Sequence, residues 1–379
     1  MTQPFPLIDV SGSPQARGIQ YGRAGAERIK RGIAHYSAQM SRSGLDAAGL
    51  QTLVRAYLPV IEGFDDTYVP EMRGIAEGAG VAFEDIVMLN ARTELLQLAA
   101  SPERRARLLP PSEGCTAVAV LPHVTADGAL IHAQNWDWKA ECAETGVVLR
   151  IRREDGPDIL TFTEAGGLAR SGLNSAGIGI TANYLQSDRD YRDVGVPLAL
   201  IRRKVLQSAH LAAAMKAVYA TRKSASNNIM VSHAGGIVID FECAPDETFQ
   251  VHPEAGMLVH ANHFVSPVAL SKLKDTGVAS TPDSLYRDLR VATLLRPRLP
   301  HATPADVKRA LADDFETPFA VCRPVRPATT GDNLTATVAM VVMQPGAGCM
   351  QVAPLPAHGI RFTDYALTPD VTATRSAAE

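Results

Sequence analysis

A cysteine between glycine and threonine is the most reactive arrangement in this sequence. Gly114, Cys115 and Thr116 lie between an arginine- and proline-rich segment, residues 101–114, and an alternating apolar run at 116–121. A thiol at the junction of an exposed loop and a strand is placed to attack the peptide bond that precedes it. Glycine at 114 favours such an N-to-S acyl shift, because a residue without a side chain reaches strained backbone geometries.

Cleavage of the Gly114–Cys115 bond would give the thiol its own base. A thiol is a weak nucleophile unless a base or a nearby positive charge raises its thiolate fraction. The α-amino group freed at Cys115 would have a pKa of about 8, so part of it is neutral and able to accept the thiol proton. The neighbouring His123 and His132 lie in or beside predicted strands, and we expect them to be surface or core residues.

The spacing of apolar residues predicts helices before Cys115 and mostly strands after it. Residues 15–40, 50–79 and 83–98 have apolar side chains at helical intervals, and Pro70 interrupts the second stretch or starts a new helix. Later helices are predicted at 198–208, 209–219, 284–295 and 305–313. Strands are predicted at 116–121, 129–138, 146–153, 159–164, 168–173, 177–184, 228–232, 236–243, 247–251, 257–261, 334–343 and 350–353. Antiparallel strands with segregated helices indicate an α+β fold of stacked layers.

Several short motifs follow the cysteine in a fixed order. They are AQNWDW at 133–138, FTEAGG at 162–167, GLNSAG at 172–177, VHANH at 259–263 and VCR at 321–323, and RGIAEGAG at 73–80 precedes them. The ordered set resembles the acyl-coenzyme A:6-aminopenicillanic acid acyltransferase family of N-terminal nucleophile hydrolases. That family includes β-alanyl-amine hydrolases and is distantly similar to conjugated bile acid hydrolases. The resemblance covers about residues 70–340, and it does not account for the arginine- and proline-rich segment.

The resemblance implies a fold and a processing step. The fold would be a four-layer αββα sandwich, with two antiparallel sheets between layers of helices. Cleavage before Cys115 would divide the chain into a helical N-terminal fragment, residues 1–114, and a catalytic fragment, residues 115–379. The two fragments would stay associated as one globular unit, and further association into a homo-oligomer is compatible with this arrangement.

The resemblance also implies a set of site residues around the nucleophile. Cys115 matches the nucleophile, and Gly114 and Cys115 flank the autocleavage site. Its partners would be Asp137, which orients the new α-ammonium, Asn262 as side-chain oxyanion donor, Asn183 as backbone N–H oxyanion donor, and Arg323 as the cation that favours thiolate.

Each of these residues could instead have a purely structural role. Asp137 could end a strand, Asn262 could occupy a turn, and Arg323 could be a surface cation. Glu164 lies in an otherwise apolar strand and, with Tyr184, is a candidate for substrate binding; it could also be buried with a structural partner.

A metal site and several other classes are not favoured. His260 and His263 are three residues apart, but no third ligand has suitable spacing, so we expect no metal. The formal net charge is −3 with scattered basic residues, which argues against a nucleic-acid partner. The five cysteines are widely spaced, the N-terminus lacks a signal peptide, and no apolar run approaches the roughly 20 residues that span a membrane. We therefore expect free thiols and a cytoplasmic protein without membrane partners.

These observations predict an autoprocessed cysteine amidohydrolase that cleaves a small N-acyl amide through a thioester acyl-enzyme. No cofactor is expected. One alternative is an N-acyltransferase that uses a coenzyme A thioester as acyl donor at the same site. A second is a non-catalytic binding protein that retains the fold, with an intact chain. A third is a conventional cysteine peptidase in which His260 or His263 serves as the base.

Overall fold

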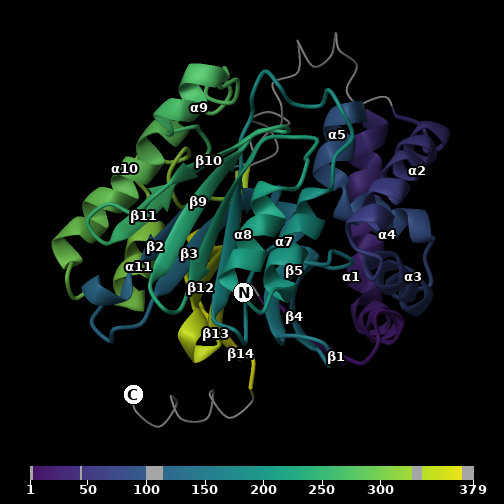
Figure 1. Cartoon of the computed structure of the whole chain (residues 1–379), viewed down its shortest axis with the longest axis horizontal. Helices are drawn as coiled ribbons and strands as arrows, with labels where there is room; N and C mark the ends of the chain where they lie inside the picture. Colours follow the sequence, from purple (N-terminus) through teal and green to yellow (C-terminus); the bar gives the residue numbers. More distant parts are fainter. Residues whose placement is uncertain (1–2, 43–44, 100–113, 327–334, 369–379) are drawn as a thin grey trace.

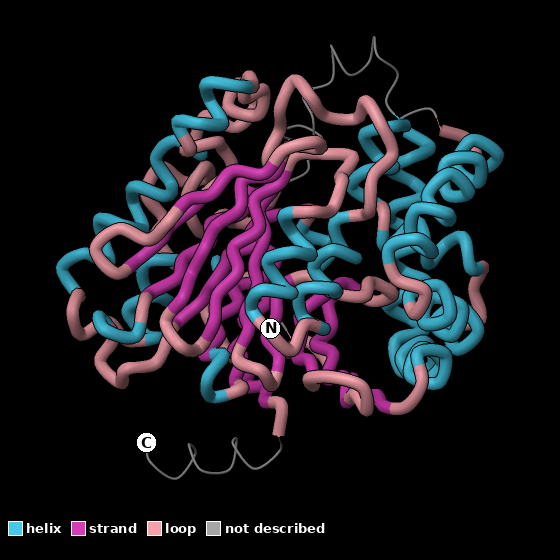
Figure 2. Tube along the Cα trace, in the orientation of Figure 1, coloured by secondary structure: helices cyan, strands magenta, loops and turns pink. Residues whose placement is uncertain are grey.

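Two β-sheets lie face to face between two groups of helices in the computed structural model of this chain (Figures 1 and 2). The structure describes residues 3–42, 45–99, 114–326 and 335–368. Most of the arginine- and proline-rich segment predicted to be an exposed loop, residues 100–113, lies outside the described residues.

The larger sheet has eight strands in the order β1-β4-β5-β6-β7-β8-β9-β10. Neighbouring strands run antiparallel, except for β1 and β4, which are parallel. The strands are β1 (Leu7–Ser11), β4 (Gly146–Arg152), β5 (Ile159–Glu164), β6 (Ser171–Asn174), β7 (Ile178–Tyr184), β8 (Asn227–His233), β9 (Ile237–Cys243) and β10 (Thr248–Val251).

The smaller sheet has six antiparallel strands in the order β11-β2-β3-β12-β13-β14. They are β11 (Met257–His260), β2 (Gly114–Val120), β3 (Ile131–Trp138), β12 (Ala336–Gln344), β13 (Cys349–Pro354) and β14 (Thr363–Ala366). Strand β2 occupies an interior position, so Cys115 lies inside the sheet rather than at its edge.

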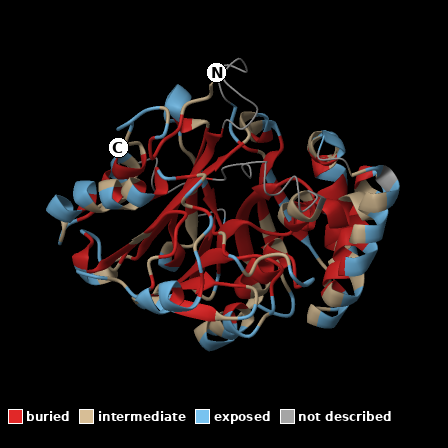
Figure 3. Cartoon of the chain, turned by 90° about the horizontal axis from the view of Figure 1, so that it is seen from above, coloured by how far each residue is buried: buried red, intermediate tan, exposed pale blue. Residues whose placement is uncertain are grey.

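Helices cover the outer faces of both sheets. On the smaller sheet, α10 (Ser284–Leu295) and α11 (Pro304–Leu311) contact β2, β3, β11 and β12, and α9 (Pro267–Lys272) lies beyond them. On the larger sheet, α7 (Leu198–Gln207) and α8 (Leu211–Tyr219) contact strands β6 to β9. The order helix, sheet, sheet, helix is the αββα sandwich that the family resemblance implies. Figure 3 shows the buried residues gathered in the sheets and on the inner sides of the helices.

The N-terminal helices form a bundle beside the larger sheet. They are α1 (Pro14–Arg42), α2 (Ala47–Phe64), α3 (Tyr68–Ala79), α4 (Phe83–Asn90) and α5 (Arg92–Ala99). Glycines let α1 and α3 approach closely: a Cβ added at Gly18 or Gly22 would collide with backbone carbonyls of α3, and one at Gly74 or Gly78 with carbonyls of α1. Because only glycine fits at such a contact, these four positions fix how the two helices pack.

The predicted elements are present, and two strands were not predicted. β1, β14 and the short helix α9 were not predicted. The helices predicted at 50–79 and 83–98 are each divided in two, into α2 and α3 and into α4 and α5. A hydrogen bond links the segments that contain the two missed strands. The hydroxyl of Tyr365 in β14 donates to the carbonyl oxygen of Phe5, just before β1, over 2.6 Å.

Candidate active site

Cys115 is the second residue of β2, and its side chain points into the space between the sheets. Ala117 and Ala119, which share its face of the strand, pack on residues of the larger sheet such as Met230 and Val238. Val118, on the other face, packs against α10 and α11. Because side chains alternate along a strand, Cys115 faces the larger sheet, and it is only 1% exposed.

Gly114 stands where no side chain would fit. A Cβ at this position would lie 2.5 Å from Oδ2 of Asp137 and 2.8 Å from Cζ of Arg323. The carboxylate and the guanidinium therefore lie directly against the residue that precedes the candidate nucleophile. Glycine at 114 is explained by this close approach, which adds to the backbone freedom inferred from the sequence.

Asp137 is fully buried in β3, opposite Gly114 in the strand pair. Its Oδ1 accepts a 2.6 Å hydrogen bond from the hydroxyl of Thr337, and its Oδ2 lies 3.4 Å from Nε of Arg323. Burial raises the pKa of this carboxyl group, while Arg323 and Arg287 act to lower it. The carboxylate is on the helix side of the sheet, at the point where the new α-amino group would appear.

Arg323 is a core residue rather than a surface cation, with 2% of its area exposed. Its guanidinium pairs with Asp283 and donates a 2.7 Å hydrogen bond to the hydroxyl of Thr335. Its backbone N–H donates to Thr337 over 2.8 Å. The side chain is thus fixed beside Gly114 and Asp137 by partners from two separate segments, at residue 283 and at residues 335–337.

Asn262 binds the backbone of the candidate nucleophile. Its Oδ1 accepts a 2.7 Å hydrogen bond from the backbone N–H of Cys115, and its Nδ2 donates to the carbonyl oxygen of Tyr184 over 2.9 Å. A carboxamide nitrogen carries two N–H donors. One of them is engaged by Tyr184, and a role of the second as oxyanion donor stays a prediction.

Arg287 is a site residue that the sequence analysis missed. This fully buried side chain on α10 donates to the carbonyl oxygen of Cys115 over 2.7 Å and to Oδ1 of Asn262 over 2.7 Å. It also donates to the hydroxyl of Thr116 over 2.9 Å and pairs with Asp283 at 2.8 Å. One guanidinium therefore holds the backbone of Cys115 and sets which way the Asn262 amide points. The one feature of the sequence that could have indicated it is the position of Arg287, one helical turn after Asp283.

Four charges meet around Gly114 and Cys115. Asp283 bridges Arg287 and Arg323, and Arg323 lies beside Asp137. Two buried cations are balanced by two buried carboxylates, which is the condition under which buried charges are tolerated. The sequence prediction for Asp137, Asn262 and Arg323 placed all three near Cys115, and the structure brings them together there.

Asn183 lies on β7 of the larger sheet, and its side chain reaches the segment of the smaller sheet that leads into Asn262. Its side-chain Nδ2 donates to the carbonyl oxygens of His260 and Ala261, at 2.8 and 2.9 Å, and its Oδ1 accepts from Nε2 of Gln134. The side chain thus supports the segment that leads into Asn262. A backbone donor role for Asn183 stays a prediction.

His260 is held in a buried ionic cluster with Asp240 and Glu242. Its Nε2 lies 2.9 Å from Oε1 of Glu242, and its Nδ1 lies 3.1 Å from the carbonyl oxygen of Ala261. Burial acts to lower the pKa of His260, but Asp240 and Glu242 outweigh it and raise the pKa to about 9. A cation with both ring nitrogens engaged is not a general base. His263 uses Nδ1 to contact the hydroxyl of Ser284 at 2.8 Å.

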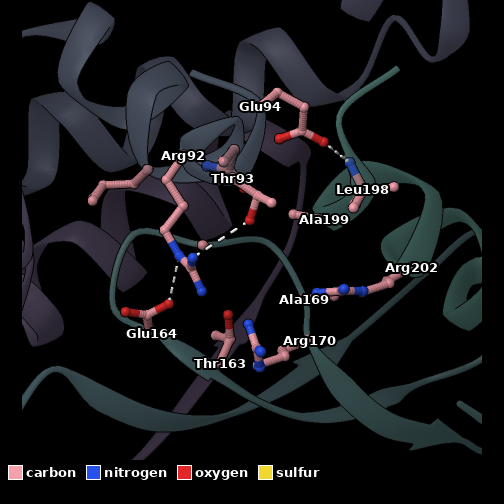
Figure 4. Close-up of a pocket in the computed structure, with 13 residues that line it drawn as sticks. Arg92, Thr93, Glu94, Thr163, Glu164, Ala169, Arg170, Leu198, Ala199 and Arg202 are labelled. Atoms are coloured by element: carbon pink, nitrogen blue, oxygen red, sulfur yellow. Dashed lines mark hydrogen bonds and ion pairs between the residues drawn. The ribbon is translucent and has the colours of Figure 1, made fainter. Parts of the chain in front are cut away.

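Glu164 and Tyr184, the candidates for substrate binding, occupy different places. Glu164 accepts from the hydroxyl of Tyr36 over 2.6 Å and from Nε of Arg92 over 2.8 Å, so it has structural partners and also lines a cavity (Figure 4). Tyr184 presents its backbone carbonyl to Asn262, and its hydroxyl lies 3.2 Å from that of Tyr191.

The other cysteines are buried or partly buried thiols without a disulfide partner. All five cysteines are free. Burial raises the pKa of Cys142 and Cys243, and that of Cys322 to about 12, so these thiols stay protonated.

Within the described ranges, no three His, Cys, Asp or Glu side chains gather closely enough to hold a metal ion. None of the helices described has the length and apolar content for crossing a membrane.

Comparison with known proteins gives a family and several relatives. The family model of acyl-coenzyme A:6-aminopenicillanic acid acyl-transferases matches residues 124–354, a range that contains Asp137, Asn183, Asn262 and Arg323. The chain is 30% identical over 319 residues to the acyl-coenzyme A:6-aminopenicillanic-acid-acyltransferase 40 kDa form of Emericella nidulans. That alignment covers 83% of this chain and 84% of the relative.

Solved structures give more distant matches. A variant of conjugated bile acid hydrolase from Clostridium perfringens aligns with a TM-score of 0.48 at 13% identity, over 67% of this chain and 92% of that one. The Caenorhabditis elegans ortholog of N-acylethanolamine-hydrolyzing acid amidase aligns with a TM-score of 0.43 at 16% identity, over 67% and 100%. The family model and the Emericella relative establish that this chain is a member of the acyl-coenzyme A:6-aminopenicillanic acid acyltransferase family, an enzyme that acts on amide bonds by hydrolysis or acyl transfer.

Proposed function

We propose that the protein cleaves its own Gly114–Cys115 bond and then uses Cys115 as an N-terminal nucleophile on a small N-acyl amide. The observation that carries this proposal is the convergence of Asn262, Asp137 and Arg323 on the peptide unit at Gly114 and Cys115. Burying charged and amide groups is costly, and a strand that served only the fold would not require so many of them at one peptide bond.

The cleavage step would move the acyl group of Gly114 from nitrogen to sulfur. Sγ of Cys115 attacks the carbonyl carbon of Gly114, the C–N bond breaks, and the nitrogen takes the thiol proton to become an amine. Water then hydrolyses the thioester and releases the Gly114 carboxylate and a free thiol. Asp137, already against Gly114, would hold the new α-ammonium, and Oδ1 of Asn262 would remain its second acceptor.

Turnover would repeat this chemistry on a substrate. The α-amine takes the thiol proton, Sγ attacks the amide carbonyl, and the remaining N–H of Asn262 stabilises the oxyanion. The amine leaves with a proton and a thioester remains on Cys115. Water completes a hydrolase cycle. An amine acceptor would complete an acyltransferase cycle, and the Emericella relative favours this as a second candidate, with a coenzyme A thioester as acyl donor.

The test is the mass of the protein under denaturing conditions. We expect the wild type to yield fragments of 114 and 265 residues, and Cys115→Ala to remain one chain of 379 residues. Incubation with N-acyl amides should then place one acyl group on Cys115 of the cleaved protein. A wild-type chain that stays intact and takes up no acyl group would support a non-catalytic binding protein instead. The ratio of acid to new amide formed with an added amine separates hydrolysis from transfer.

A further inference from the structure

Side chains from other elements hold the loop that carries Asn262. This loop joins β11 to α9. The backbone N–H of Phe264 donates to Oδ2 of Asp275 over 2.8 Å, and that of Ser266 donates to Oε2 of Glu242 over 3.1 Å. The position of Asn262 in the site therefore depends on side chains that reach the loop from elsewhere in the chain.

Ser284 binds the backbone of Asn262 itself. It is the first residue of α10 and is fully buried. Its Oγ accepts the backbone N–H of Asn262 over 2.7 Å. The contacts with Cys115, Tyr184 and Arg287 involve the side-chain carboxamide of the same asparagine. Ser284 therefore fixes where Asn262 lies, and the other three contacts fix how its amide is turned.

The hydroxyl of Ser284 also contacts the next residue of the loop, His263. Nδ1 of His263 lies 2.8 Å from Oγ of Ser284, and Nε2 lies 3.8 Å from Oδ2 of Asp288. A serine oxygen carries a single hydrogen. Because the N–H of Asn262 donates to this oxygen, the hydroxyl hydrogen is left to donate to Nδ1 of His263. The ring proton then resides on Nε2, where the Asp288 carboxylate favours it.

A serine, a histidine and an aspartate in contact are also the components of a hydrolase triad. In this protein Ser284 is fully buried, and its oxygen already binds the N–H of Asn262. A nucleophile must reach a substrate carbon, and this oxygen would have to give up Asn262 to do so. The arrangement is therefore suited to supporting the loop rather than to attacking a substrate.

The charges around His263 keep its ring neutral near pH 7. Burial lowers the pKa of His263, and the cations His260 and Arg287 act in the same direction. Asp288 and Asp275 act to raise it. A neutral ring can accept a hydrogen bond at Nδ1, whereas a protonated ring cannot. Protonation, at a pH below about 6.5, would therefore break the hydrogen bond that the serine hydroxyl donates.

We propose that Ser284 and His263 act as positioning residues that hold Asn262 in place for catalysis. This inference rests on the proposed function, in which an N–H of Asn262 stabilises the oxyanion during turnover. His263 would orient the hydroxyl of Ser284, and Ser284 would hold the backbone of Asn262. A displacement of about 1 Å at such a donor is enough to lower a rate by up to about 10²-fold.

Turnover of serine variants tests the contact with Asn262. Ser284→Ala removes the acceptor, and we expect kcat to fall about tenfold with little change in KM. Ser284→Thr keeps a hydroxyl and should recover part of the loss. Ser224→Ala is the matched control, because this buried hydroxyl accepts the N–H of Gly195 over 2.8 Å and contacts Tyr57 at 3.2 Å. It should lower the melting temperature and leave kcat nearly unchanged. Equal losses of kcat in the two alanine variants would overturn the positioning role.

The pH dependence of turnover tests the contact with His263. His263→Asn supplies a carbonyl oxygen that can accept from Ser284, and it does not titrate. We expect its kcat to be close to that of the wild type at about pH 7.5. The ratio of wild-type kcat to that of His263→Asn should then fall about tenfold by about pH 4.5, as the histidine takes up a proton. A ratio that stays constant over this interval would exclude His263 from the arrangement.

The tautomer of His263 can be measured whether or not the protein turns over. Long-range proton–nitrogen correlation spectra of histidine-labelled protein distinguish the two ring tautomers, and His263→Asn identifies the signal. We expect the Nε2–H form in the wild type and a mixture of forms in Ser284→Ala. A proton on Nδ1 in the neutral wild type would overturn the proposed arrangement. The Nε2–H form in a protein that neither cleaves itself nor takes up an acyl group would reject the proposed function, and the catalytic role of the two residues with it.

Discussion

The backbone nitrogen of Cys115 lies 2.7 Å from the carboxamide oxygen of Asn262. This contact decides the orientation of the amide, because Arg287 donates to the same oxygen. The nitrogen of the amide is thereby turned toward the carbonyl oxygen of Tyr184. The backbone of Cys115 and the guanidinium of Arg287 thus fix together which way the Asn262 amide points.

Replacing Asn262 by aspartate should remove catalysis while retaining the fold. A carboxylate can still accept from Cys115 and Arg287, but it has no N–H to offer an oxyanion. We expect kcat to fall about 10²- to 10³-fold with little change in KM. Asn174→Asp is the control, since Asn174 is also buried and donates to Leu206 and Ser208. It should lower the melting temperature and leave kcat nearly unchanged; equal losses of kcat in both would speak against the donor role.

Replacing Gly114 by alanine should slow self-cleavage. The added methyl group would lie 2.5 Å from Oδ2 of Asp137 and 2.8 Å from Cζ of Arg323, so both charged groups must move. We expect the precursor to lose about 1–3 kcal/mol of stability and to accumulate uncleaved, as followed by denaturing mass measurement over time. Gly63→Ala in α2 adds a methyl group with no atom within 4 Å and should cleave normally. Cleavage of Gly114→Ala at the wild-type rate would contradict this account.

Replacing Arg287 by lysine should reduce turnover although the charge is kept. One ammonium group cannot bind Cys115, Thr116, Asn262 and Asp283 at the distances that the guanidinium spans. We expect kcat to fall about tenfold or more, as for loss of charge-assisted hydrogen bonds, with a smaller effect on KM. Arg290→Lys, on the same helix and paired with Asp313 near the surface, provides the control. Similar kinetics for the two variants would remove Arg287 from the site.

The His260 cluster should make stability depend on pH. The pKa of His260 is raised to about 9 in the folded protein, against about 6.5 when unfolded. Its contribution is therefore complete below about pH 6.5 and is lost as the pH rises through about 9. We expect the free energy of unfolding, measured by denaturant titration, to fall by a few kcal/mol over this interval.

His260→Gln is the matched variant for this pH dependence. It should be less stable than the wild type near pH 7, because Glu242 and Asp240 lose their buried cation. It should also show a shallower fall of stability toward pH 9. Parallel curves for the two proteins would mean that His260 does not carry the charge.

The sequence predicted most of the elements because these depend on local patterns, and the resemblance of its ordered motifs to a known family pointed to the residues near Cys115. Apolar spacing identifies helices such as α1, and the motif around Asp137 identifies the strand that faces the cysteine. Arg287 was missed because its partners come from distant segments, including Cys115, which is 172 residues away. An arginine on a mixed helix face looks the same in a sequence whether it is exposed or at the centre of the site.

The strand β1 was missed for a related reason. It has five residues, and its burial alternates between exposed and buried. Its strand character depends on parallel pairing with β4, from Leu7 opposite Val148 to Ser11 opposite Arg152, which no local pattern reveals. Glu164 likewise could not be assigned from sequence, since its partners Tyr36 and Arg92 lie in separate N-terminal helices.

The pairing of β1 with β4 has a consequence for how the protein can be assembled. In an uncut chain, the N-terminal strand finds β4 as an intramolecular event whose probability does not depend on concentration. After cleavage before Cys115, the same pairing joins two separate molecules, and recovery from denaturant becomes a bimolecular reaction. The mature protein would then refold slowly when dilute, whereas Cys115→Ala would not. The cut would thus commit the protein to the structure that it reached as a precursor.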